Sequence, residues 1–281
     1  MKHLLGFILL LASTLPHGTS AQYRSEAGPA RLGERVTQAA GEVFRWYDAP
    51  VFLVYAVNRY QVVEDDDKPV QISVSPLERL LSRSIAVPGS ESPGSIHPFT
   101  LPHLLLGARA VHVAAVELFD DDGNAGDELR LGMGLYRSLM YTQVATQAIK
   151  HAVHRTRPDG SDDKSFVSGH ASVAFAFATW VRLEASDAIR SNEWLRGQPV
   201  WSDALHTLAW TACYGWASYV GYSRMRDNKH YLGDVLAGAA LGTVMSVLVY
   251  SDVTEQGLPF LDGIGFTSID GVPGVALHVS F

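Results

Sequence analysis

Two cations in the middle of the chain are spaced to bind one anion. Lys150 precedes Arg157 by seven residues, close to two turns of an α-helix, so both side chains can lie on one face. Pro158 follows directly and favours a helix end near Arg157, because the residue before a proline is disfavoured in the helical conformation. Two positive side chains that project together at a helix end can bind the oxygens of an oxyanion such as phosphate.

A second segment, Ser168-Gly169-His170, opens an apolar stretch that is expected to be helical. Serine is a favoured N-cap residue, and glycine lets an anion approach the backbone closely. The unpaired amides at such a helix start would point toward a phosphate. His170 would then lie at the rim of the anion site, where an imidazole can exchange a proton with a bound group.

The third segment, SRMRDNKHYLGD, adds a cation and a histidine–carboxylate pair. Asp227 and Asn228 are expected to cap a helix that starts just after them, so that His230 lies in its first turn. Asp234 follows four residues later and would face His230. A carboxylate that accepts a hydrogen bond from one imidazole nitrogen leaves the other nitrogen free to attack. Arg224 supplies a third positive charge just outside this helix.

Each of these residues has an ordinary structural explanation when taken singly, such as an ion pair or a helix cap. Such explanations do not account for the joint order and spacing of these residues, which resemble those of one known family. The chain resembles the type 2 phosphatidic acid phosphatase and vanadium haloperoxidase superfamily, and in it the bacterial periplasmic acid phosphatases, in Lys150-x6-Arg157-Pro158, Ser168-Gly169-His170 and Ser223-Arg224-x5-His230-x3-Asp234. One position departs from the family pattern, since Val167 stands where proline is usual.

The resemblance implies a role for each matched residue. Phosphate oxygens would be bound by Lys150, Arg157, Ser168, Gly169 and Arg224. His230 would attack phosphorus and form a phosphohistidine, Asp234 would orient His230, and His170 would protonate the leaving oxygen. The implied activity is hydrolysis of phosphate monoesters, either lipid and prenyl phosphates or soluble esters, with no metal or other cofactor. Vanadate is expected to inhibit it.

These motifs require several helices around one site. Apolar residues three and four apart predict helices over 43–60, 101–119, 127–154, 169–186, 203–222 and 229–250, with a short one near 77–84. Beyond residue 257 the apolar residues alternate, and Asp270-Gly271 suits a hairpin turn. The predicted fold is therefore all-α: a multi-helix bundle with the active site between its helices, plus a short C-terminal β-hairpin.

The N-terminus predicts a secretory signal peptide over residues 1–21. Lys2 is followed by a short apolar run and then by small residues before a cleavage site after Ala21. The rest of the chain divides into a helical phosphatase domain over 22–250 and a C-terminal extension over 251–281. A cleaved signal places the protein in the periplasm or outside the cell.

The formal net charge of -7 argues against nucleic-acid binding, which uses a basic surface. Residues 231–250 have the length of a membrane span, but interior charges such as Arg109 and Arg137 in other predicted helices argue against a polytopic membrane protein. The acidic loop 120–128 lacks the glycine and glutamate positions of an EF-hand, so no metal site is predicted. The expected partner is a phosphorylated small molecule or lipid, and association with a membrane surface stays open. The sequence indicates no oligomeric state.

Two other functions remain open at this stage. In a vanadium-dependent haloperoxidase the same residues would hold vanadate as a cofactor. The alternating C-terminal segment also suggests a noncatalytic envelope protein, although one hairpin cannot close a barrel. Phosphate release from lipid and soluble esters, measured with and without a chelator, distinguishes these functions.

Overall fold

The computed structural model describes residues 32–59, 70–87, 89–96, 98, 100–119, 125–255, 264–269 and 272–277. Its helices are α2 (Leu32–Val43), α3 (Asp48–Arg59), α4 (Pro76–Ile85), α5 (Pro93–Ile96), α6 (Thr100–Phe119), α7 (Gly126–Ala152), α8 (Gly169–Ser191), α9 (Glu193–Arg196), α10 (Pro199–Arg226) and α11 (Leu232–Thr254). The all-α fold class predicted from the sequence is confirmed. The predicted signal peptide lies outside the described residues, so its cleavage stays a prediction.

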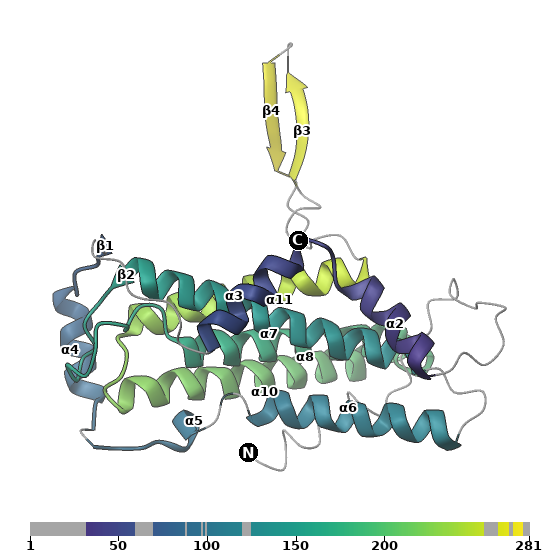
Figure 1. Cartoon of the computed structure of the whole chain (residues 1–281), viewed down its shortest axis with the longest axis horizontal. Coiled ribbons are helices and arrows are strands. Elements are labelled where there is room, and N and C mark those ends of the chain that lie inside the picture. The colour runs from purple at the N-terminus through teal and green to yellow at the C-terminus, as the bar shows by residue number, and fades with distance from the viewer. Residues whose placement is uncertain are drawn as a thin grey trace.

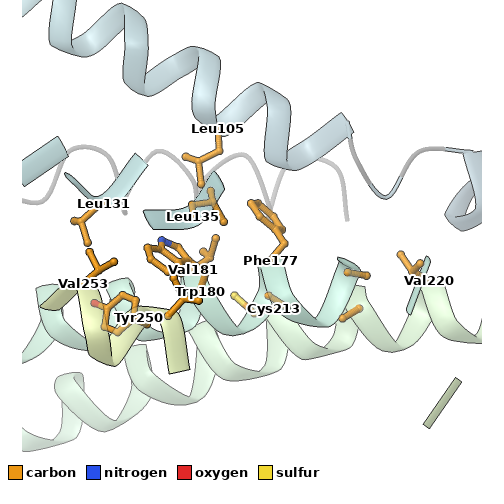
Figure 2. Packing of buried hydrophobic residues seen from close by; sticks show 14 of the residues in the cluster. Leu105, Leu131, Leu135, Phe177, Trp180, Val181, Cys213, Val220, Tyr250 and Val253 are labelled. Carbon is orange, nitrogen blue, oxygen red and sulfur yellow. The ribbon is translucent and has the colours of Figure 1, made fainter. Parts of the chain in front are cut away.

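The long helices α7, α8, α10 and α11 lie side by side along one direction, with α8 in contact with each of the others (Figure 1). Their shared core is aromatic. Trp180 of α8 meets Tyr250 of α11 edge to face, with ring centroids 5.0 Å apart, and Phe177 meets Trp216 of α10 in the same way. Figure 2 shows Leu131, Leu135 and other apolar side chains closing around Trp180. The core therefore joins the same helices that carry the sequence motifs.

Helices α8 and α11 approach each other very closely through two glycines of α11. A Cβ atom on Gly242 would lie 2.0 Å from the carbonyl oxygen of Ser172, and one on Gly238 would lie 2.5 Å from that of Ser168. Only glycine leaves room for backbone at that distance. This contact holds the start of α8 against the start of α11, where Ser168 N donates to the Asp234 carbonyl at 3.0 Å.

The segment before α6 is attached to the motif-bearing end of the bundle. Strand β1 (Val70–Gln71) pairs in parallel with β2 (Val153–His154), which directly follows α7. Ser75 then caps α4 by accepting a hydrogen bond from the backbone of Glu78 at 3.2 Å. Figure 1 shows α4 crossing the end of the bundle at a steep angle to the long helices.

The start of α11 differs from the prediction. The helix begins at Leu232 with Tyr231 as N-cap, so His230 precedes the helix and does not lie in its first turn. Asp227 and Asn228 do not cap α11. Asp227 ends α10, and Asn228 has a φ of 57°, the left-handed conformation that asparagine tolerates and that turns the chain between two helices.

Two C-terminal segments are extended. β3 (Ile264–Ile269) and β4 (Val272–Leu277) run antiparallel, with Ile264 opposite Leu277. The expected turn at Asp270-Gly271 lies outside the described residues. The hairpin as a part of the fold therefore stays a prediction.

Candidate active site

His230 is held in a defined orientation and tautomer. Its side chain is 2% exposed, and its Nδ1 lies 2.8 Å from the carbonyl oxygen of Ser165. A carbonyl only accepts hydrogen bonds, so Nδ1 carries the proton and Nε2 keeps its lone pair. Burial lowers the pKa of His230 to about 4, and the charges of Lys150 and Arg157 act in the same direction, against the opposing effect of Asp234. The imidazole is therefore neutral at neutral pH and suited to nucleophilic attack.

Asp234 supports His230 indirectly, which corrects the expectation of a direct hydrogen bond. Its Oδ2 lies 3.8 Å from Nδ1 of His230, beyond hydrogen-bonding distance. Oδ2 accepts instead from the hydroxyl of Ser165 at 2.5 Å and from the backbone of Tyr231 at 2.8 Å. Because the same Ser165 binds His230 through its carbonyl, Asp234 positions the imidazole through Ser165.

Arg155, which the sequence analysis did not single out, completes the surroundings of Asp234. This arginine is buried; one terminal nitrogen donates to Asp234 Oδ1 and the other to Glu78 Oε2 at 2.8 Å. Its guanidinium also lies over the ring of Tyr231, 4.9 Å from the centroid. Oε1 of Glu78 accepts from the backbone of Gly233 at 3.1 Å. Arg155 and Glu78 thus tie the first turn of α11 to α4.

The three predicted phosphate-binding cations lie close enough for their charges to affect one another. Lys150 is buried in the last turn of α7, where its Nζ donates to the carbonyl of Lys164. Burial, together with the charges of Arg157 and Arg224, lowers its pKa to about 8 against the opposing effect of nearby carboxylates. Arg157 is fixed by its Nε, which donates to Asp162 at 2.6 Å.

Arg224 lies in the last turn of α10 and is buried. Its Nε has no hydrogen-bond partner among the described residues. Asp227, one turn further on, holds this helix end by accepting hydrogen bonds from the hydroxyls of Ser90 and Ser92, both at 2.7 Å. A buried guanidinium with an unused donor is suited to an incoming anion.

The start of α8 meets these cations. Ser168 is buried at the N-cap, and its hydroxyl accepts from the backbone of Ala171 at 3.4 Å. A Cβ on Gly169 would lie 4.0 Å from Cε of Lys150, so the first amides of α8 and this ammonium are neighbours. His170, the second residue of α8, is half-buried beside them. The structure therefore brings the first turn of α8, with Ser168, Gly169 and His170, to Lys150.

The assembled groups favour an oxyanion over a metal. They are positive side chains, helix-start amides and imidazoles, which bind and protonate phosphate oxygens. Among the described residues no group of three or more His, Cys, Asp or Glu side chains could hold a metal ion.

Comparisons with known proteins agree with this arrangement. Residues 131–257 match the family model of the PAP2 superfamily. A segment is 35% identical over 120 residues to the lipid A 1-phosphatase of Porphyromonas gingivalis, covering 43% of this chain and 22% of that protein. Another is 31% identical over 91 residues to phospholipid phosphatase 1 of Rattus norvegicus, covering 32% of this chain and 29% of that protein. Lipid phosphate phosphatase 2 of Arabidopsis thaliana is 32% identical over 147 residues, covering 42% of this chain and 49% of that protein.

The chain thus spans about half or less of the length of these relatives. A solved structure of a transmembrane PAP2-type phosphatidylglycerolphosphate phosphatase from Bacillus subtilis aligns with 76% of this chain and 98% of its own, at 17% identity and a TM-score of 0.42. The sequence motifs, the family model and the three relatives agree. The resemblance to the type 2 phosphatidic acid phosphatase superfamily is therefore confirmed over residues 131–257.

Proposed function

We propose that this protein is a phosphatase that hydrolyses lipid phosphate monoesters through a phosphohistidine on His230. The observation that carries the proposal is the fixed tautomer of His230. Its Nδ1 is engaged by the Ser165 carbonyl, which leaves a neutral Nε2 beside Lys150 and Arg157.

The proposed reaction has two steps. Lys150, Arg157 and Arg224 bind the phosphate oxygens while Nε2 of His230 attacks phosphorus, and the bond from phosphorus to the leaving oxygen breaks. His170 gives its proton to that oxygen, which leaves as an alcohol. In the second step His170 takes a proton from water, the hydroxide oxygen attacks phosphorus, and the bond to Nε2 breaks to release phosphate.

The outer surface of the bundle supports a lipid substrate. Of the described helices, α11 alone is long and apolar enough to cross a bilayer, and only 33% of its most apolar window is buried. Its exposed side carries Leu236, Ala240, Val244 and Leu248, and residues 235–251 contain no charge. Residues 204–223 of α10 also contain none. Such faces contact lipid readily, which favours membrane association, a possibility that the sequence analysis kept open.

Phosphate release from phosphatidate in mixed micelles and from p-nitrophenyl phosphate tests the activity. We expect turnover that survives EDTA and falls with vanadate, and a phosphoenzyme that can be trapped by rapid acid quench. The His230→Ala variant should form none, whereas His112→Ala, an exposed histidine of α6, should match the wild type. Labelled protein in His230→Ala would reassign the nucleophile, and bromide oxidation with vanadate and peroxide would assign the haloperoxidase instead.

The general-acid role of His170 is tested by comparing two leaving groups. An alkoxide needs a proton to leave, whereas p-nitrophenolate leaves readily without one. His170→Ala should therefore lose about 10²–10⁴-fold in kcat/KM for alkyl phosphates and clearly less for p-nitrophenyl phosphate. Equal losses for both esters would remove His170 from the role of general acid.

A further inference from the structure

Helix α4 lies across the end of the bundle that carries the candidate active site. Figure 1 shows its steep crossing of the long helices. Glu78 on its inner side binds Arg155 at 2.8 Å and the backbone of Gly233 at 3.1 Å. Just beyond the helix, the backbone of Val87 donates to the carbonyl of Arg226 at 2.8 Å. These bonds fix α4 beside the starts and ends of the helices that form the site.

The outward side of α4 carries two exposed leucines. Leu77 is 64% exposed and Leu80 is 63% exposed, while the ionised Glu78 faces inward. Arg79 and Arg83 are also exposed and stand one turn apart next to Leu80. A helix that faces water normally keeps all its leucines toward the protein, whereas α4 has only Leu81 and Ile85 half-buried and leaves Leu77 and Leu80 exposed. The combination of leucines and arginines on one exposed side is typical of helices that lie in a membrane surface.

We propose that α4 docks on a bilayer surface with anionic lipids. Leu77 and Leu80 insert below the headgroups, and Arg79 and Arg83 pair with lipid phosphates. Charge supports this occupant, because Arg79 and Arg83 are both exposed and a positive side chain close to an anionic lipid surface is attracted to it. A second copy fits less well, since a twofold contact through this face would place the arginines of both copies near one another.

The direction of α4 supports the same occupant. The uncharged outer sides of α10 and α11 run along the bundle, and α4 runs across it. A bilayer in contact with the long helices would therefore hold α4 within its surface plane. Only the purpose of this docking rests on the proposed function. Docking of α4 keeps the active site at the depth of the lipid headgroups, where a lipid phosphate lies.

A fluorescent label on α4 reads this docking directly and independently of catalysis. Ser84 is exposed next to Leu80, and the chain's own Cys213 is buried. The full-length Ser84→Cys variant is labelled on the introduced thiol with an environment-sensitive dye. It is then combined with vesicles of phosphatidylcholine alone or of phosphatidylcholine with phosphatidylglycerol. Nitroxide-labelled lipids in the same vesicles report contact with the bilayer.

We expect a blue shift and quenching by the nitroxide lipids, both stronger with phosphatidylglycerol. Arg79→Gln/Arg83→Gln in the labelled protein should weaken the dependence on anionic lipid, by about fivefold in affinity for each arginine. Leu77→Gln/Leu80→Gln should remove the quenching. An unshifted, unquenched label, or equal response to both vesicles before and after the arginine changes, overturns the proposal.

Kinetics separate this proposal from the proposed activity. Both double variants should keep the kcat/KM of the parent for soluble p-nitrophenyl phosphate, which also shows that they fold. They should lose about tenfold or more for phosphatidate in phosphatidylglycerol vesicles. The control is Arg190→Gln, which removes one positive charge at the far end of α8 and should lose nothing. If the leucine variant loses quenching but keeps its activity on both esters, docking is supported without a role in turnover. If the parent protein is quenched but inactive on every ester, only the proposed phosphatase function is overturned.

Discussion

The carbonyl oxygen of Ser165 lies 2.8 Å from Nδ1 of His230, while the carboxylate of Asp234 stays 3.8 Å from the same nitrogen. A backbone carbonyl therefore selects the tautomer of the proposed nucleophile. The carboxylate acts one bond further away, through the hydroxyl of Ser165 at 2.5 Å. The imidazole is thus positioned by two groups: the Ser165 carbonyl, which substitution of the side chain leaves in place, and the Asp234 carboxylate, which substitution removes.

The first prediction concerns the hydrogen bonds that link Asp234 to His230 through Ser165. Ser165→Ala and Asp234→Asn each remove a hydrogen bond to a charged group, so each should slow phosphoenzyme formation by about 10–100-fold. Because Asp234 acts through its hydrogen bond with Ser165, the double variant should be little slower than the slower single variant. Rapid-quench single-turnover rates for the four proteins of the cycle measure this. Losses that multiply would show that Asp234 acts on His230 directly.

The second prediction separates two neighbouring arginines. Arg155 neutralises the buried Asp234, so Arg155→Met leaves an unpaired buried charge and should cost about 3–5 kcal/mol in the free energy of unfolding. Arg157 pairs with the more exposed Asp162, so Arg157→Met should cost only about 0–1 kcal/mol. Arg157→Met should instead raise KM, since it removes a proposed phosphate ligand. Urea unfolding and steady-state kinetics measured on both variants test the contrast, and the reverse pattern would exchange the two roles.

The third prediction is a bell-shaped dependence of kcat/KM on pH. Protonation of His230 blocks attack, so activity should fall as the pH drops through about 4, the pKa to which burial lowers this imidazole. Loss of the proton of Lys150 weakens phosphate binding, so activity should fall as the pH rises through about 8. In Lys150→Arg combined with His170→Ala, assayed with p-nitrophenyl phosphate, the basic limb should disappear, because arginine stays protonated and the proton of His170 is no longer used. A basic limb unchanged in that variant would belong to another group.

The fourth prediction follows from the same histidine and concerns acid stability. The folded-state pKa of His230, about 4, lies below its ordinary value of 6.5. Between these values the unfolded chain binds the extra proton and the folded chain does not, so this contribution is complete above pH 6.5 and is lost as the pH falls toward 4. His230→Gln should flatten the decline of the free energy of unfolding across this window. An identical slope in both proteins would contradict the burial argument.

The fifth prediction tests the close packing of α8 and α11. Gly242→Ala places a methyl group 2.0 Å from the Ser172 carbonyl, so the helices must separate, at a cost of about 1–3 kcal/mol. Gly215→Ala in α10 meets no atom within 4 Å and should stabilise the protein by about 0.4–1 kcal/mol. Thermal unfolding of this matched pair shows whether the contact matters. Equal melting temperatures would mean that the backbone yields without cost.

The sequence predicted the helices well because their periodic apolar faces are buried against one another. Helix ends were harder, and α11 shows why. Asp227 and Asn228 are both good N-cap residues, yet Asn228 uses its tolerance of the left-handed conformation to turn the chain. Local residue type cannot decide between capping and turning, because the neighbouring helix determines which is needed.

The motif residues could be singled out because their types and order are local features of the sequence. The shared helix face expected for Lys150 and Arg157 was wrong, since α7 ends at Ala152 and Arg157 lies beyond it. Arg155 was not singled out, since it looks like one more cation beside Arg157, and its partner Glu78 is 77 positions away in the chain. Ser165 was missed for another reason. It acts on His230 through its carbonyl, a group that every residue has, so only the folded backbone shows it.

Helices α8 and α11 both begin at the site, at Gly169 and Leu232, so two positive helix ends converge where the three cations gather. The positive electrostatic potential of these groups attracts a phosphate ester and the inorganic phosphate formed by its hydrolysis alike. On the proposed reaction, the product is therefore retained by the same forces that capture the substrate. Turnover would then be paced by phosphate departure and would slow as free phosphate accumulates around the protein.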